Sequence, residues 1–361
     1  MSTPLPSPSF ALPRLRAGRA LPSVALALIL GLLATELARL PWLAEHGLGA
    51  LVLAMLLGMA LGNTRYPAWQ PACDSGVAWS RQTLLRAGIV LYGLRLTLQD
   101  IGHMGWAGVA ADAAVLCSTF ALAVWIGTRW LGLERGTAIL IGAGSSICGA
   151  AAVLATAPVA RARADQVAVA VATVVVFGTL AVFIYPLLYT LALQATGDAA
   201  AVARFFGLYV GATVHEVAQV VATGRSLGAE TAGDAVVAKL VRVLMLAPFL
   251  ATLAWWLGRG GRRAAGTAPA ASLAQSMPWF AVAFMAVVAL NSAIAVPPAL
   301  AQALRALDDL LLASAMAALG LGIQHSALRR AGFKPLLLAG LLFVWLMAGG
   351  ALFTGLAMAT R

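Results

Sequence analysis

The composition of this 361-residue chain excludes an ordinary soluble domain. Apolar residues make up 61% of it, charged residues only 10%, and its mean hydropathy is +0.91, whereas a soluble domain carries about 25% charged residues. The formal net charge of +11 comes mostly from arginines in short loops, where positive charge sets membrane orientation and does not indicate nucleic-acid binding. The chain is predicted to be a membrane protein whose partner is the lipid bilayer.

The three cysteines, Cys73, Cys117 and Cys148, form no C-x-x-C pair and have no metal-ligand spacing. We therefore expect no disulfide, no iron–sulfur or zinc centre and no cofactor. The first apolar segment is too long, and too poor in small residues at a cleavage position, to be a signal peptide.

In chain order, we expect a cytoplasmic tail over residues 1–20 and one transmembrane domain over residues 21–357. The predicted fold is an all-α polytopic bundle of about 9–11 segments, since runs of this length can cross a core of about 30 Å. The predicted spans are Leu21–Leu40, Leu48–Gly62, Leu84–Leu98, Met104–Gly127, Val167–Leu193, Ala235–Leu257, Pro278–Val296, Ala299–Ile323 and Pro335–Ala357. A Gly-, Ala- and Arg-rich stretch over residues 258–276 predicts a flexible cytoplasmic loop.

Two further apolar stretches, Thr137–Val159 and Phe205–Thr223, are interrupted by glycine and polar residues. If both crossed the membrane completely, Arg161 and Arg163 would lie outside, against the positive-inside rule. If both dip in and return, from opposite faces, these arginines stay inside and the later arginine clusters are cytoplasmic in either case. We favour re-entrant or broken helices, which the bilayer tolerates only beside protein or a wet cavity.

The first interrupted stretch contains "GAGSSICGAAAVLATAP". Its glycines Gly142, Gly144 and Gly149 allow the backbone to leave helical geometry, and Gly144, Cys148 and Gly149 are expected to contact the substrate. We expect Ser145 and Ser146 to lie at a helix N-terminus, where free N–H groups attract an anion. The alternative is a small-residue surface for helix packing.

The second interrupted stretch contains "VGATVHEVAQVVA". It resembles the start of the zinc-protease motif H-E-x-x-H, but Gln219 stands where the second histidine would be. A charged carboxylate at the bilayer centre costs about 2.5–3.5 kcal/mol, so His215 and Glu216 are predicted to carry the coupling ion. Thr213 and Gln219, the latter on the same helical face, are expected to contact substrate; the alternative is that these groups only join helices by hydrogen bonds.

Other charged residues within apolar segments have two interpretations. Lys239 and Arg242 share a helical face and either extend to the interface or supply positive charge to an anion pathway, and Arg95 is a similar case. Asp112 is too isolated to assign. The neighbouring Asp308 and Asp309 are expected to face water or to pair with Arg305.

Internal symmetry is faint in the sequence. Residues 91–105 and 318–332 have glycines at matching offsets, and the charge rule predicts that they run in opposite directions, as in an inverted repeat. The two interrupted stretches lie one span apart, which a simple duplication does not explain.

The stretches "LLRAGIVLYGLRLTLQDI", "GAGSSICGAAAVLATAPV", "VAVATVVVFGTLAVFIYPLLY", "YVGATVHEVAQVVA" and "KLVRVLMLAPFL" resemble the YeiH-type bacterial inner-membrane proteins, a family labelled as sulfate exporters. They occur in the expected order between residues 84 and 250. The resemblance implies a secondary transporter, related in fold to cation/proton antiporters and bile-acid-type carriers. It also implies location in a bacterial inner membrane.

We therefore expect a non-enzymatic secondary transporter that exports a small, sulfate-like anion, coupled to protons or sodium, with a cytoplasmic N-terminus and a possible homodimeric state. The chain has no G-x-x-x-x-G-K-[ST] loop for ATP. Two alternatives stay open: a passive anion channel, and an intramembrane enzyme that uses His215 and Glu216.

Overall fold

The computed structural model describes residues 17–40, 42–43, 49–102, 104–259, 279–294, 296–323 and 331–360. These residues form helices joined by short connections, without a strand among them. The all-α polytopic prediction is confirmed. Most of the predicted N-terminal tail and residues 260–276 of the predicted loop lie outside the described residues.

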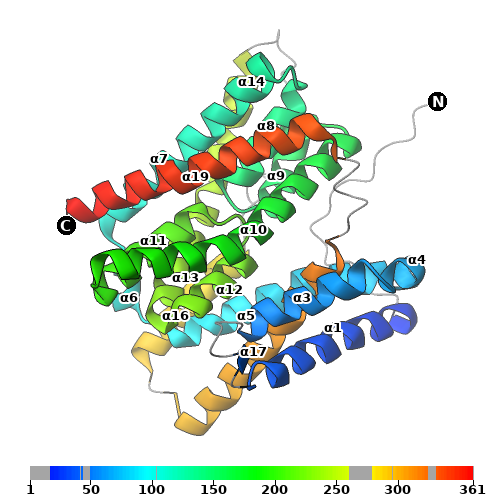
Figure 1. The fold of residues 1–361 in the computed structure, drawn as a ribbon, viewed down its shortest axis with the longest axis vertical. Coiled ribbons are helices and arrows are strands. Elements are labelled where there is room, and N and C mark those ends of the chain that lie inside the picture. The colour runs from blue at the N-terminus through cyan, green and yellow to red at the C-terminus, as the bar shows by residue number, and fades with distance from the viewer. Residues whose placement is uncertain are drawn as a thin grey trace.

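The helices form two groups, which Figure 1 shows side by side. The first, here called the peripheral bundle, contains α1 (Ala17–Leu37), α3 (Ala50–Gly62), α4 (Tyr66–Trp79), α5 (Leu85–Tyr92), α16 (Trp279–Ala293) and α17 (Pro298–Leu321). The second, here called the hairpin bundle, contains α7 (Gly105–Trp125), α8 (Arg135–Ser146), α9 (Ala150–Val159), α10 (Ala164–Thr196), α11 (Ala199–Thr213), α12 (Val217–Leu227), α13 (Ala229–Leu244), α14 (Leu246–Arg259) and α19 (Phe333–Ala359). The short α6 (Leu98–Gly102) connects the two.

Four described helices are long and apolar enough to cross a membrane: Gly105–Trp130, Ala164–Thr196, Ala229–Leu257 and Phe333–Ala359. Shorter apolar helices, such as α3 and α16, occupy other predicted spans. In the peripheral bundle, α3 and α17 approach so closely that a side chain at Gly58 or Gly320 would overlap the backbone of the other helix. Small residues at such contacts are typical of helices packed in lipid.

The first interrupted stretch forms a re-entrant hairpin, here called hairpin 1 (α8 and α9). The guanidinium of Arg163, just after α9, bonds both carboxylate oxygens of Glu134, just before α8, at 2.8 and 3.1 Å. The side-chain amide of Gln166 donates to the same carboxylate at 2.8 Å. Because its two ends meet, the chain enters and returns at one end of the molecule, called the Glu134 end. A complete crossing is excluded, and the re-entrant prediction is confirmed.

The second interrupted stretch forms hairpin 2 (α11 and α12), which enters from the opposite end. The 33-residue α10 separates the two hairpins and carries the chain to this end, called the Asp198 end. The hydroxyl of Thr231, at the start of α13, lies 3.4 Å from the carbonyl of Ala203, near the start of α11. Since Gly224, near the end of α12, packs against Ala232, α12 has returned to the end where α11 began.

The inverted repeat stays a prediction, because residues 324–330 lie outside the described part of the chain. In the part that is described, α5 and α17 run in opposite directions. Arg95, just after α5, bonds Asp308 near the start of α17, and Gly88 packs against Leu312 further along α17. This relative direction is the one that an inverted repeat requires.

Candidate functional site

The tips of the two hairpins meet inside the hairpin bundle. The backbone N–H of Ala150, the first residue of α9, donates to the Glu216 carboxylate of hairpin 2 at 3.4 Å. The ammonium of Lys239, on α13, donates to one carbonyl in each tip, Ile147 and Val214, at 2.6 Å in both cases. Lys239 therefore connects the tips of the two hairpins.

Hairpin 1 turns at residues 147–149 because Gly149 adopts a φ of 69°, which other residues rarely adopt. A Cβ on Gly149 would also lie 2.5 Å from Cγ of Glu216. Gly144 is equally confined, since a Cβ there would meet Val153 and Val174. Cys148 is buried beside the turn. Glycine thus permits both the turn and the close contact between the hairpins.

The predicted place of Ser145 and Ser146 is wrong. Both lie at the end of α8, not at a helix N-terminus, because the chain leaves helical geometry after them, with its turn at Gly149, the last of the three glycines in this stretch. The N-terminus that does form, that of α9, faces the Glu216 carboxylate, in agreement with the attraction of a helix N-terminus for negative charge. The Ser145 hydroxyl is buried without a hydrogen-bond partner in the described structure, whereas Ser146 makes a 3.5 Å contact with the carbonyl of Ala143.

Hairpin 2 turns at residues 214–216, so the prediction that His215 and Glu216 lie on a helix with Gln219 is also wrong. Glu216 is the N-cap of α12, and its N–H donates to the side-chain oxygen of Gln219 at 3.1 Å. Gln219 itself is fully buried and fills the space that Gly178 leaves open on α10. Glu216 and Gln219 are therefore held together by a helix cap instead of a helical face, and His215 lies beside them without joining the cap.

His215 is buried, with 1% of its surface exposed, and its ring lies 6.3 Å from that of Phe343. Neither ring nitrogen has a hydrogen-bond partner in the described structure. A bond to the neighbouring Glu216 is not formed. Within the described ranges, three or more His, Cys, Asp or Glu residues nowhere gather closely enough to hold a metal ion.

Lys239 and Arg242 do not extend to the interface, because both side chains are buried, at 1% and 0% exposure. The Arg242 guanidinium forms an ion pair with Asp112 of α7 at 2.8 Å and donates to the carbonyl of Ala212 in hairpin 2. Asp112 is therefore not isolated. The sequence alone does not identify Arg242 as the partner of Asp112, since 130 residues separate the two.

Thr213 is the last residue of α11, and its hydroxyl both donates and accepts a hydrogen bond within the protein. Its hydroxyl donates to the carbonyl of Tyr209 at 2.5 Å and accepts from the hydroxyl of Tyr185, on α10, at 2.7 Å. A substrate could reach this hydroxyl only by replacing one of these bonds. Thr213 therefore anchors hairpin 2 to α10.

Arg95 is not brought to the tips but lies between the two bundles, toward the Asp198 end. It pairs with Asp308 at 2.9 Å and Asp309 at 2.8 Å, and Arg225 of hairpin 2 pairs with the same two carboxylates. Asp308 and Asp309 thus pair with Arg95 and Arg225 and not with the Arg305 side chain, as the sequence suggested. Asp308 is buried and does not face water.

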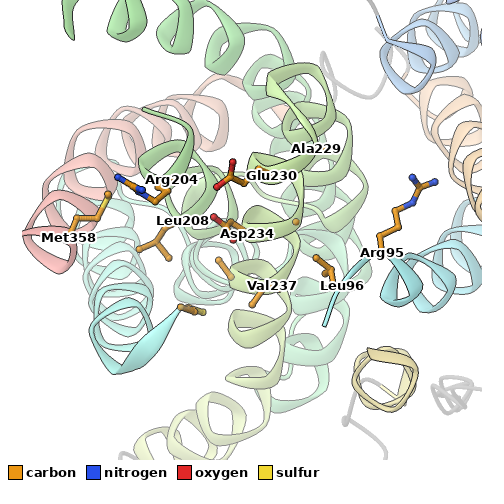
Figure 2. A pocket seen from close by; sticks show the side chains of 12 residues that line it. Arg95, Leu96, Arg204, Leu208, Ala229, Glu230, Asp234, Val237 and Met358 are labelled. Carbon is orange, nitrogen blue, oxygen red and sulfur yellow. The ribbon is translucent and has the colours of Figure 1, made fainter. Parts of the chain in front are cut away.

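A cavity of about 870 Å³ opens beside Arg95. Figure 2 shows Arg204, Glu230 and Asp234 together on one side of it and Arg95 on the other. Its lining extends along α13 as far as Val237 and Ala238, and Ala238 directly precedes Lys239. The cavity therefore runs from the Asp198 end toward the residue that joins the two tips.

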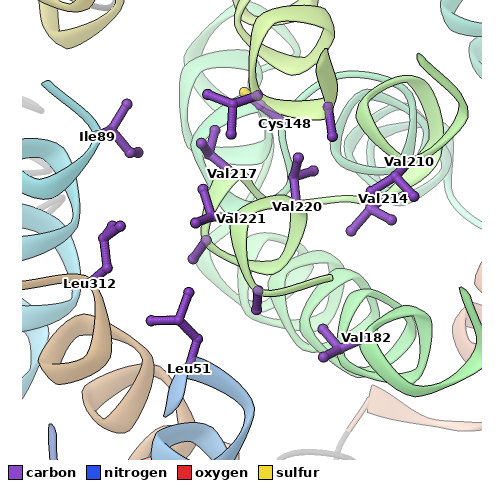
Figure 3. Close-up of a cluster of buried hydrophobic side chains, with 14 of the residues drawn as sticks. Leu51, Ile89, Cys148, Val182, Val210, Val214, Val217, Val220, Val221 and Leu312 are labelled. Atoms are coloured by element: carbon purple, nitrogen blue, oxygen red, sulfur yellow. The ribbon is translucent and has the colours of Figure 1, made fainter. Parts of the chain in front are cut away.

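Apolar side chains separate hairpin 2 from the peripheral bundle. Figure 3 shows Val217 and Val221 of α12 facing Ile89 and Leu312 across the boundary between the bundles. All four are buried. Around these four residues the boundary is apolar, and it carries the charged cluster of Arg95 and Arg225 with Asp308 and Asp309.

These features define an all-α polytopic membrane protein with two opposed re-entrant hairpins that meet at a buried, charged site. Over residues 22–339, the sequence matches the family described as Conserved hypothetical protein 698. The chain belongs to this family, and the YeiH-type resemblance is confirmed.

Curated relatives are UPF0324 membrane proteins. One from Pseudomonas aeruginosa is 55% identical over 339 residues, covering 94% of this chain and 95% of the relative. The UPF0324 inner membrane protein YeiH of Escherichia coli K12 is 48% identical over 330 residues, covering 91% and 92%, and a relative in Yersinia pestis is 49% identical over 332 residues, covering 92% and 91%. No solved structure matches the chain.

Proposed function

We propose that the chain is a secondary transporter that binds a small anion where the tips of the hairpins meet and couples its movement to protons or sodium. The supporting observation is that Lys239 bonds to both tips, directly beyond a cavity that starts at one end. Interrupted helices at mid-depth typically form the substrate sites of secondary transporters.

The charges at the tips favour an anion that moves together with a proton. With His215 neutral, the positive charges of Lys239 and Arg242 balance the negative charges of Asp112 and an ionised Glu216, and Arg81 of the peripheral bundle adds a further positive charge near Glu216. Protonation of Glu216 therefore leaves an excess of positive charge at the tips, which an anion neutralises, and this limits the high cost of burying net charge. Glu216 is therefore the proposed proton carrier, and Ser145, Gln219 and His215 are the proposed polar contacts to substrate.

The proposed orientation places the Glu134 end in the cytoplasm, since Arg135, Arg161 and Arg163 lie at this end and short cytoplasmic loops are rich in arginine. The test uses single cysteines at Arg161 and, at the other end, at Asp198, with native cysteines removed. In intact cells, an impermeant maleimide added outside should label Asp198→Cys and leave Arg161→Cys unlabelled. The reverse pattern would invert the orientation.

The proposed function is tested by the flux of labelled sulfate and other small anions into proteoliposomes, with imposed pH and sodium gradients. Glu216→Gln keeps the shape of the side chain but fixes it in a neutral state, so it should fold and lose flux driven by a pH gradient. Glu36→Gln, at an exposed ion pair with Arg39, is the matched control.

The same measurement separates the alternatives. Flux that follows the anion gradient alone, without saturation or ion coupling, would identify a channel. Normal proton-driven flux in Glu216→Gln would remove Glu216 from the mechanism, and dependence on sodium would then identify the coupling ion. A hydrolytic product in place of flux would identify an enzyme.

A further inference from the structure

A second cavity, of about 430 Å³, lies between the two bundles and is distinct from the tips. Its charged lining residues are Arg95, Arg225, Arg305 and Asp309, which together carry a formal charge of +2. The cavity therefore combines room for a small molecule with an excess of guanidinium groups. This excess favours an anionic ligand.

The two aspartates beside the cavity, Asp308 and Asp309, differ in exposure, which suggests that a bound anion could take the place of the exposed one. The side chain of Asp308 is 1% exposed, and its Oδ2 accepts from Arg95 at 2.9 Å and from Arg225 at 3.0 Å. The side chain of Asp309 is 45% exposed, and its Oδ1 accepts from the same two arginines, at 2.8 and 2.6 Å. Asp308 is thus a fixed anchor, while Asp309 occupies, from the solvent side, a position that another oxyanion could take.

Both guanidinium groups are held in place before any ligand arrives. The Cζ atoms of Arg95 and Arg225 lie 5.7 and 5.3 Å from the ring centre of Tyr92, close enough for cation–π attraction. With Asp308 on one side and Tyr92 on another, the two arginines keep a fixed spacing. Rigid guanidinium groups match the oxygen atoms of carboxylate, sulfate or phosphate, and less side-chain entropy is lost on binding.

The position of this cavity connects it with the tips. It shares Arg95, Leu96, Ala229 and Gly233 with the larger cavity, which continues to Ala238 beside Lys239. The paired arginines therefore lie beside the cavity that extends from the Asp198 end along α13.

We propose that the cavity lined by Arg95, Arg225 and Arg305 binds a small oxyanion, which replaces Asp309 on the first two arginines. The site is separate from the tips and adjoins the larger cavity at the Asp198 end. Binding at this site does not require that transport be proton-coupled, so it can be tested without flux.

The test is equilibrium binding of radiolabelled sulfate, and in parallel phosphate, to the purified full-length protein in detergent. Asp309→Asn removes the internal competitor and raises the local charge by one, so it should tighten binding about fivefold or more. Arg305→Gln leaves all four ion pairs in place and should weaken binding about two- to fivefold, because it removes one nearby positive charge. Arg129→Gln, on the hairpin bundle outside both cavities, is the control and should change nothing.

The proposal is overturned if neither anion binds the wild type or Asp309→Asn. It is also overturned if Asp309→Asn lowers the thermal midpoint but leaves affinity unchanged, since the ion pairs would then only hold the bundles together. Tighter binding in Asp309→Asn together with absent flux in proteoliposomes would support this site while contradicting the proposed transport.

Discussion

Hairpin 1 and hairpin 2 reach the same point from opposite ends, but they supply different chemistry. Hairpin 1 offers backbone groups: the carbonyl of Ile147 to Lys239 and the N–H of Ala150 to Glu216. Hairpin 2 also offers a backbone group, the carbonyl of Val214 to Lys239, and adds two polar side chains, Glu216 as the cap of α12 and His215 beside it. The comparison shows that both tips bind Lys239 through backbone carbonyls, whereas the carboxylate at the meeting point comes from hairpin 2 alone.

Hairpin 1 and hairpin 2 are also stabilised by different interactions. Hairpin 1 is closed at its mouth by exposed ion pairs around Arg163, while hairpin 2 is held at depth by Arg242 and by the Thr213–Tyr185 bond. We therefore expect hairpin 2 to depend on buried electrostatics and hairpin 1 on backbone geometry.

The largest expected effect is on the support of hairpin 2. Arg242→Met leaves Asp112 buried and unpaired, which should lower the free energy of unfolding by about 3–5 kcal/mol. The measurement is thermal or denaturant unfolding in detergent, followed by tryptophan fluorescence. Asp112→Leu combined with Arg242→Met should recover most of the loss; if it does not, the pair matters through other contacts of Arg242.

The next effect concerns the backbone of hairpin 1. Gly149 and Gly197 have almost the same φ, 69° and 70°, but a Cβ on Gly197 meets nothing within 4 Å. Gly197→Ala should therefore cost only the left-handed strain, about 1–2 kcal/mol. Gly149→Ala should cost more and also displace Glu216. Equal losses of stability, with normal flux in both variants, would contradict the proposed contact between the tips.

A smaller effect should distinguish the two serines of hairpin 1. Ser145 has no hydrogen-bond partner within the described structure, so Ser145→Ala should leave stability unchanged or slightly higher and weaken anion binding by about 0.5–1.5 kcal/mol. Ser146→Ala loses only a long contact with Ala143 and should change affinity less. Labelled-anion binding measures both, and equal affinities in wild type and Ser145→Ala would leave this residue with a packing role.

The smallest effect is at the mouth of hairpin 1. Hydrogen bonds from Arg163 hold the pKa of the Glu134 carboxyl below its ordinary value. Carboxyl groups with a lowered pKa stabilise the folded state above the unfolded pKa of about 4, and this contribution is lost as the pH falls below it. Arg163→Gln should thus lower the thermal midpoint slightly at pH 7 and by less at pH 3, since the contribution is lost as the pH falls through the lowered folded pKa. Arg39→Gln, at another exposed pair, is the control, and an equal difference at both pH values would contradict the assignment.

The sequence was sufficient for the architecture because that depends on local patterns. Runs of apolar residues marked the helices, and the position of Arg161 and Arg163 in the positive-inside rule indicated that hairpin 1 returns. The position of its turn was less certain, since three glycines permit it equally and only Gly149 adopts a positive φ. This is why Ser145 and Ser146 were placed on the wrong side of the break.

The electrostatic partners could not be predicted, because they join distant parts of the chain. Asp112 meets Arg242, and Asp308 meets Arg95 and Arg225, each across elements whose relative placement no local pattern determines. Charge counting could have suggested such pairs, since isolated buried carboxylates are costly. It could not have chosen among the arginines.

The two hydrogen bonds that Lys239 donates to the tips affect how the two hairpins could separate from α13. Its ammonium contacts Ile147 and Val214 at the same distance, so neither tip can separate from α13 without giving up a charge-assisted hydrogen bond of about 1.5–3 kcal/mol. Either bond can break while the other holds, so one tip could move away from α13 while Lys239 stays bound to the other. Release of both tips at once costs both hydrogen bonds, and separation of one tip at a time is therefore less costly.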